Sequence, residues 1–220
     1  AIVLLDFARD RRELEYFLRQ QFDCLGARYA ALPVNFSTGM PLSDTPLFRD
    51  ALMGLRLAGS DGATVFSRSE VLALLRSPFL SGDEEPDGTA MLRLRTALTE
   101  LMSETIDWRD LTHLAQTFTP ESHLARVLST LATARDTRGR CRPSEWLEVA
   151  RRQLRLWGWP GSRPLDSLEY QQFERLEASF DDLILLDEVA VVILFSRFIA
   201  LWESVLQDRI FQPKTPNSAT

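Results

Sequence analysis

Apolar residues recur at helical spacing along most of the chain, and this periodicity limits the possible folds more than any other sequence feature. Across residues 48–55 they stand at positions i, i+3, i+4 and i+7, which is the pattern of an amphipathic helix. Pro46 and Pro143 stand where a helix would begin. Ser67 and Glu70 have the spacing of a capping box, which satisfies free amides at a helix start. The sequence therefore predicts a mainly α fold, built as an array of many helices.

Two long helices are expected near the C-terminus, and a smaller mixed element near the N-terminus. The first helix carries apolar residues along one face between Phe173 and Leu183. The second begins at Asp187 and is apolar nearly all round from Val189 to Trp202, as in a helix that others surround. The opening run AIVLLD has the composition of a strand, and a helix follows it. These residues predict a small N-terminal α/β element beside the helical array.

Three parts are expected from these patterns. Residues 1–60 would form the α/β element and a connecting helix, and residues 61–208 the helical domain. Residues 209–220 end in a polar, proline-containing run and are expected to be a linker tail. The opening strand has few obvious partners in the sequence and the other end resembles a linker, so we expect a segment taken from a longer protein.

Composition excludes several kinds of chemistry. Among 25 basic residues the only lysine is Lys214, so a Schiff base or a phosphate-loop lysine is not expected in the interior. His113 and His123 have no carboxylate or cysteine neighbours at ligand spacing, and no metal site is predicted. Cys24 and Cys141 lack a CxxC partner, which excludes a zinc site of that type. We therefore expect no catalytic residue and no metal in this chain.

The chain is expected to be cytoplasmic, with no part in the membrane. The apolar run at residues 1–5 is too short for a signal peptide because Asp6 ends it. The longest apolar run, residues 189–195, is far below the roughly 20 residues that a membrane span needs. The unpaired cysteines agree with a reducing compartment.

Arginines form the best candidate binding site. Four of them lie within residues 135–142, which contain a single aspartate, and three more follow between residues 151 and 155. The candidate DNA-contact residues are Arg135, Arg138, Arg140, Arg142, Arg151, Arg152, Arg155 and Trp159. Guanidinium groups suit phosphates because their donors fork towards two oxygens, and a tryptophan can stack on a base. The alternative is a loop of solvated arginines, with Trp157 in the core and Trp159 facing either way.

Three segments, in chain order, resemble one family. Residues 33–57 match its extended run, glycine turn and Pro-Leu pairs, followed by Ala-Leu-x-x-Leu-Arg-Leu. Residues 71–80, VLALLRSPFL, are similar to the end of its next helix, and residues 158–173, GWPGSRPLDSLEYQQF, to a later loop-to-helix segment. On these residues the chain resembles the AddB-like and RecB-like helicase–nuclease proteins. Within them it is similar to bacterial DNA repair proteins with a C-terminal PD-(D/E)XK exonuclease domain.

The resemblance implies an internal position in such a protein. Residues 1–60 would belong to a RecA-like domain, and residues 61–208 to a UvrD-like helical subdomain inserted in it. The phosphate loop and the nuclease would lie outside the chain, so the longer protein would use ATP and Mg²⁺ while this part holds no cofactor. No catalytic motif of the family has a counterpart here.

Two functions are therefore expected as alternatives. The first is a non-catalytic domain of a DNA repair exonuclease or helicase-like protein, acting as a scaffold and contacting DNA phosphates during double-strand break processing. Its partners would be DNA, and other domains or a partner subunit of a helicase–nuclease complex. The second is a helical protein–protein interaction or regulatory module unrelated to DNA. The net charge of −6 and the apolar C-terminal helix favour this second function.

Overall fold

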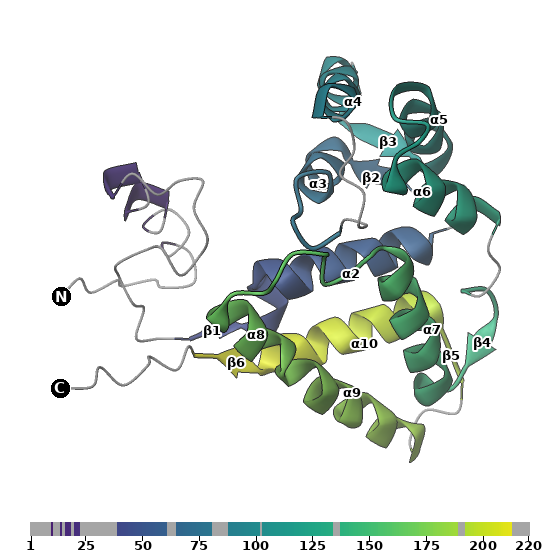
Figure 1. Ribbon diagram of the computed structural model, residues 1–220. Helices are drawn as coiled ribbons and strands as arrows, with labels where there is room; N and C mark the ends of the chain where they lie inside the picture. The colour runs from purple at the N-terminus through teal and green to yellow at the C-terminus, as the bar shows by residue number, and fades with distance from the viewer. Residues whose placement is uncertain are drawn as a thin grey trace.

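The computed structural model describes residues 39–60, 65–80, 88–101, 103–133, 137–188 and 192–212, with residues 10, 14, 16–18 and 20–22. Within these residues the chain is mainly α-helical, as the periodicity predicts (Figure 1). The helices are α2 (Pro46–Ala58), α3 (Arg68–Leu74), α4 (Gly88–Glu100), α5 (Trp108–Phe118), α6 (His123–Thr133), α7 (Pro143–Leu156), α8 (Ser167–Phe173), α9 (Arg175–Leu185) and α10 (Phe195–Asp208). Two 3-10 turns, η2 (Leu42–Asp44) and η3 (Leu186–Glu188), accompany them. No helix in this described part is both long enough and apolar enough to cross a lipid bilayer.

The strands are short and pair in antiparallel two-stranded ribbons. They are β1 (Met40–Pro41), β2 (Val65–Ser67), β3 (Thr105–Asp107), β4 (Arg140–Cys141), β5 (Ile193–Leu194) and β6 (Ile210–Phe211). β1 pairs with β6, β2 with β3, and β4 with β5. Each of the strands β2 to β5 leads almost directly into a helix. The ribbons therefore place the starts of α3 and α5 side by side, and likewise the starts of α7 and α10.

The helix starts predicted at Pro46, at Pro143 and at the capping box of Ser67 are confirmed. The Ser67 hydroxyl accepts a hydrogen bond from the Glu70 amide at 3.1 Å, and the Glu70 carboxylate accepts one from the Ser67 amide at 3.2 Å. Pro46 and Pro143 are the first residues of α2 and α7. Thr45 precedes α2, but its hydroxyl donates to the Leu42 carbonyl at 2.7 Å instead of accepting from a helix amide. That bond fixes the turn η2 against the start of α2.

Two clusters of buried apolar side chains fill the interior, and α2 contributes to both. Leu47, Phe48 and Leu55 belong to the first cluster, which also contains residues of α7, α9 and α10. Met53 and Leu57 belong to the second, with residues of α3, α4, α5 and α6. In Figure 1, α2 crosses the body between these two groups of helices. Ten of its 13 residues are buried, so α2 is the element that joins the two halves.

Two tryptophans from the loop after α7 bind the backbone of α2. The indole nitrogen of Trp157 donates to the Gly54 carbonyl at 2.9 Å, and that of Trp159 to the Leu47 carbonyl at 3.0 Å. Trp157 is 1% exposed, so its prediction as a core residue is confirmed. A Cβ atom at Gly54 would lie 3.1 Å from Trp157 Cδ1, tighter than an ordinary contact. The absent side chain at Gly54 lets the indole ring approach α2 closely.

The C-terminal region differs from the expected pair of continuous helices. The first expected helix is divided into α8 and α9 at Glu174, and α10 begins at Phe195, not at Asp187. Ile193 and Leu194 are extended because they pair with β4. The Asp187 carboxylate accepts a hydrogen bond from the Ser144 amide at 3.0 Å, near the start of α7. Asp187 therefore stabilises a different helix from the one it was predicted to open.

The two ends of the expected domain scheme are only partly described. The run AIVLLD lies outside the described residues, so the N-terminal α/β element stays a prediction. Residues 210–211, which are expected in the linker tail, form β6 and pair with β1. Phe211 is 4% exposed and belongs to the first apolar cluster, which explains why this segment is ordered against the body.

Trp157→Phe should destabilise the protein by about 1–3 kcal/mol, because it removes the hydrogen bond to Gly54 and leaves a small void. Chemical denaturation followed by circular dichroism would measure the loss. Tyr170→Phe is the control, since the Tyr170 side chain is 56% exposed and should tolerate the change. Equal stability of the Trp157 variant and the wild type would contradict the role given to this contact.

Candidate functional site

Three of the predicted arginines lie at β4 on the surface. Arg138, Arg140 and Arg142 are exposed, whereas Arg135 lies outside the described residues. Side chains alternate between the two faces of an extended strand, so Arg140 and Arg142 share one face. Cys141 points to the other face and packs against the first apolar cluster. No hydrogen bond or ion pair joins the three guanidinium groups to any other described residue, so they are available to a ligand.

The arginines of α7 do not extend this group. Arg142 and Arg155 are 13 residues apart on one helix, which corresponds to about 20 Å. Arg151 is engaged within the fold: its Nη2 atom lies 2.5 Å from Glu177 Oε2, and its guanidinium lies over the Phe180 ring at 5.1 Å. Arg152 and Arg155 are exposed, on the solvent side of the helix. The structure therefore separates the predicted patch into two parts, and the role of Arg151 is structural.

Trp159 cannot stack on a base, and its prediction as a DNA-contact residue is wrong. The side chain is 7% exposed, and its ring packs against Phe48 and Phe173 at centroid distances of 6.3 and 5.5 Å. Its indole nitrogen already donates to the Leu47 carbonyl. The sequence left the direction of this side chain open because the loop GWPG has no periodicity that would assign a buried face.

The three segments that carry the family resemblance meet in space. Segment 158–173 reaches α2 through Trp159, and a Cβ atom at Gly161 would lie 2.6 Å from the Pro78 carbonyl oxygen. The guanidinium of Arg163 lies over the Phe79 ring at 5.1 Å. It also donates to both carboxylate oxygens of Glu169, at 2.5 and 2.7 Å. These hydrogen bonds raise the pKa of Arg163 further, so its guanidinium stays charged. The contacts between the three segments are packing contacts and hydrogen bonds, and they stabilise the fold.

Asp50 is a buried carboxyl at the same junction. It lies on α2, is 5% exposed, and interacts with the Ser77 hydroxyl and with Arg49 Nε at 3.2 Å. Burial raises the pKa of this carboxyl above its usual 3.8, although the Ser77 hydroxyl and the Arg49 charge act in the opposite direction. The Ser77 hydroxyl also accepts a hydrogen bond from the Phe79 amide at 3.1 Å. Asp50 thus holds the turn after α3 against α2.

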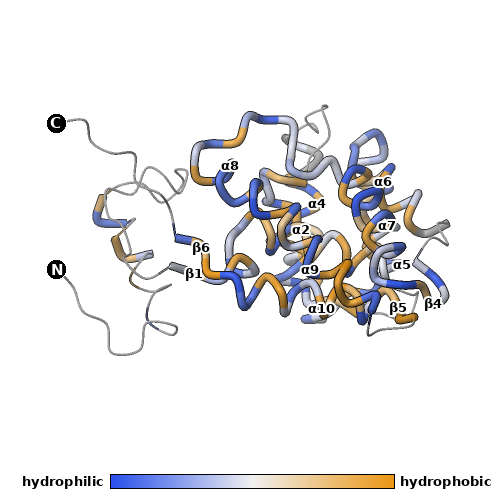
Figure 2. Tube along the Cα trace, turned by 90° about the horizontal axis from the view of Figure 1, so that it is seen from below, coloured by the Kyte–Doolittle hydropathy of each residue, from blue (hydrophilic) through white to orange (hydrophobic). Residues whose placement is uncertain are grey.

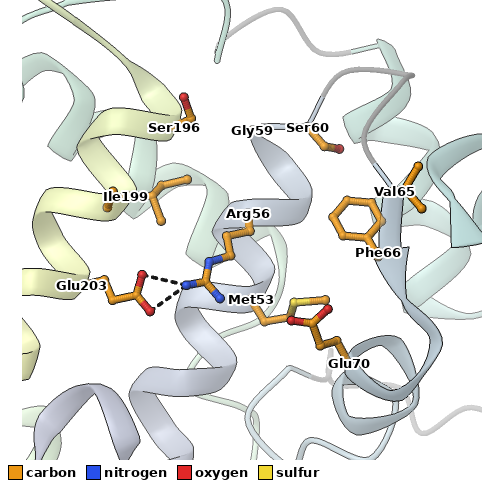
Figure 3. Close-up of a pocket in the computed structure, with 11 residues that line it drawn as sticks. Met53, Arg56, Gly59, Ser60, Val65, Phe66, Glu70, Ser196, Ile199 and Glu203 are labelled. Atoms are coloured by element: carbon orange, nitrogen blue, oxygen red, sulfur yellow. Dashed lines mark hydrogen bonds and ion pairs between the residues drawn. The ribbon is translucent and has the colours of Figure 1, made fainter. Parts of the chain in front are cut away.

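A groove of about 490 Å³ lies over one side of α2, between α10 and β2 (Figure 3). Met53 on α2 gives it an apolar floor, and Phe66 and Ile199 lie on its two walls. At one end, Arg56 Nη2 donates to both carboxylate oxygens of Glu203, at 2.6 and 2.7 Å. Sequence reasoning missed this site, because these two residues are 147 positions apart and no local pattern connects them. The groove can bind a short apolar segment but holds no arrangement of a nucleophile with a base.

The structure shows no metal site among the described residues, and comparisons with known proteins give no further indication of function. In the part of the chain that the structure describes, no three histidine, cysteine, aspartate or glutamate residues come together as metal ligands. His113 and His123 lie on α5 and α6, respectively. No family model, no curated protein and no solved structure matches the chain. Any function must therefore be argued from the arginines of β4 and from the groove.

The free energy of unfolding of Asp50→Asn, relative to that of the wild type, should increase as the pH rises above 3.8, the usual pKa of the carboxyl. The unfolded carboxyl loses its proton near its usual pKa, whereas the folded one holds it to a higher pH. Over that window the unfolded state binds fewer protons, so the wild type loses stability as the pH rises, and the asparagine variant has no such loss. Urea denaturation at several pH values would measure the difference.

Ser77→Ala is the companion variant for this measurement. It removes a hydroxyl that favours the charged form of Asp50, so the loss of stability with rising pH should be larger in this variant than in the wild type. A difference between Asp50→Asn and wild type that stays flat, or shrinks with pH, would contradict the burial argument.

Proposed function

We propose that this chain is an internal, non-catalytic domain of a bacterial DNA repair exonuclease or helicase-like protein that processes double-strand breaks. In that role it acts as a scaffold and contacts DNA phosphates through Arg138, Arg140 and Arg142. The observation that carries the proposal is the row of exposed guanidinium groups at β4, which have no partner among the described residues. Their forked donors match the paired oxygens of a phosphate.

The scaffold part of the proposal is supported by the junction on α2. The three segments of the resemblance are distant in sequence, and their contacts through Trp159, Gly161 and Arg163 are packing contacts. Segments with that role would be retained for the fold of a UvrD-like helical subdomain and not for catalysis. The longer protein would supply ATP and Mg²⁺ chemistry, work in the cytoplasm, and join this domain to other domains or to a partner subunit.

A second candidate function is a helical protein–protein interaction module, and the groove over α2 favours it. Val65 on the wall of the groove is 56% exposed beside the apolar floor. Apolar hollows with a few polar groups at the rim are typical of binding sites. This function does not exclude the first, since β4 and the groove involve different residues.

The triple variant Arg138→Ala, Arg140→Ala, Arg142→Ala should weaken DNA binding and flatten its dependence on salt. Each phosphate contact on duplex DNA contributes about 0.9 to the slope of log K against log salt, so losing three should reduce the slope by about 2.7. Fluorescence anisotropy with labelled single- and double-stranded oligonucleotides over a salt series would measure both quantities.

The matched control is Arg93→Ala, Arg109→Ala, Arg175→Ala, which removes three exposed arginines elsewhere. Both variants change the net charge from −6 to −9, because each loses three positive charges, so a general charge effect would appear in both. Equal weakening by the two variants would contradict a site at β4. No binding by the wild type at low salt would contradict DNA contact altogether.

A further inference from the structure

The groove over α2 combines a buried floor with an exposed apolar wall. The lining residues Met53, Phe66 and Ile199 are each less than a tenth exposed, whereas Val65 is more than half exposed. Figure 3 shows Val65 and Phe66 on the strand wall, across the groove from Ile199. A ligand that covers both Val65 and the apolar hollow removes apolar surface from water, which favours binding.

Charges around the groove favour a basic ligand. Glu70 and Glu203 line it, and Asp107 lies directly across the β2–β3 ladder from Val65, on the same face. Arg56 is the single basic residue among the lining residues, so Glu70, Glu203 and Arg56 together leave a charge of −1. Asp107 beside the groove adds a further negative charge. Arg68, the next basic residue on this wall, donates to the Leu101 carbonyl at 2.5 Å and is engaged there. These charges would repel a nucleic acid and attract a cationic side chain.

The size of the groove limits its ligand to a short segment. Its lining extends from Met53 on α2 to Ser60, just past the end of that helix, and from Ser196 to Glu203 on α10. Seven residues of helix measure about 10 Å. That length accommodates about three residues of extended chain. The carboxylates lie at one end and the hydroxyls of Ser60 and Ser196 at the other, so the ligand is held in one direction.

We propose that the groove binds a short segment of a partner protein in which a basic side chain stands next to an apolar one. The apolar side chain covers Val65 and enters the floor beside Met53, and the basic group meets Glu70 and Glu203. A carboxylate can accept more hydrogen bonds than Arg56 supplies to Glu203, so the existing ion pair remains in place. This inference rests on the second candidate function and is independent of DNA contact.

The test uses the methyl resonance of Met53 in the full chain, labelled with ¹³C at its four methionines. Loss of one signal in Met53→Leu assigns the resonance, and Met40 in β1, which does not line the groove, is the internal control. The probe is N-acetyl-leucyl-arginine amide, compared with the same dipeptide carrying glutamine or glutamate. We expect a saturable shift of the Met53 signal with the arginine probe and none with the glutamate probe.

Replacing Glu70 and Glu203 by glutamine should lower the affinity for the arginine probe by about threefold to tenfold, as expected for two exposed ion pairs. The matched control, Glu100→Gln with Glu174→Gln, removes two exposed carboxylates elsewhere and should leave binding unchanged. Thermal melts of both variants would establish that they fold alike.

Each other outcome overturns the inference in a different way. If all three probes shift the Met53 signal equally, the preference for a basic side chain is wrong, but the second candidate function as an interaction module is still supported. If no probe moves the Met53 signal, the groove is not a docking site, and the second candidate function falls with it. A Met53 shift that depends only on protein concentration would identify a second copy of the chain as the occupant, and would also contradict the proposal.

Discussion

The burial of α2 between two apolar clusters is the constraint on which the rest of the structure depends. Helices α7, α9 and α10 pack on one side of α2, and helices α3 to α6 pack on the other. Because apolar burial stabilises at about 25 cal/mol per Å², a helix covered on both sides helps to hold the two halves together. Trp157 fixes its position because the indole ring lies against Gly54 and donates to its carbonyl.

Both candidate binding surfaces follow from this arrangement. The groove lies where the two halves diverge over α2, and Arg56 with Glu203 joins α2 to α10 at its rim. The arginines of β4 lie on a ribbon at the end of the body remote from β1 and β6 (Figure 2). A scaffold with two separate surfaces, one cationic and one apolar with an acidic rim, suits a domain that contacts more than one partner.

Local signals in the sequence predicted much of the fold, and long-range contacts set the rest. The capping box of Ser67 with Glu70 and the prolines that open α2 and α7 depend on neighbouring residues, so the sequence alone identified them. The ribbons contain only two or three residues per strand, too few for an alternating pattern to be recognised. The site was harder to predict because the burial of Trp159 and the groove come from packing between distant segments.

Native-state hydrogen exchange of the α2 amides between Leu52 and Leu57 tests the central claim most directly. If α2 joins the two halves, these amides should exchange only through global unfolding. Their free energy of opening would then equal that of the most protected amides in both α5 and α10. Exchange of the α2 amides through a partial opening, at a lower free energy than either neighbour, would contradict the account.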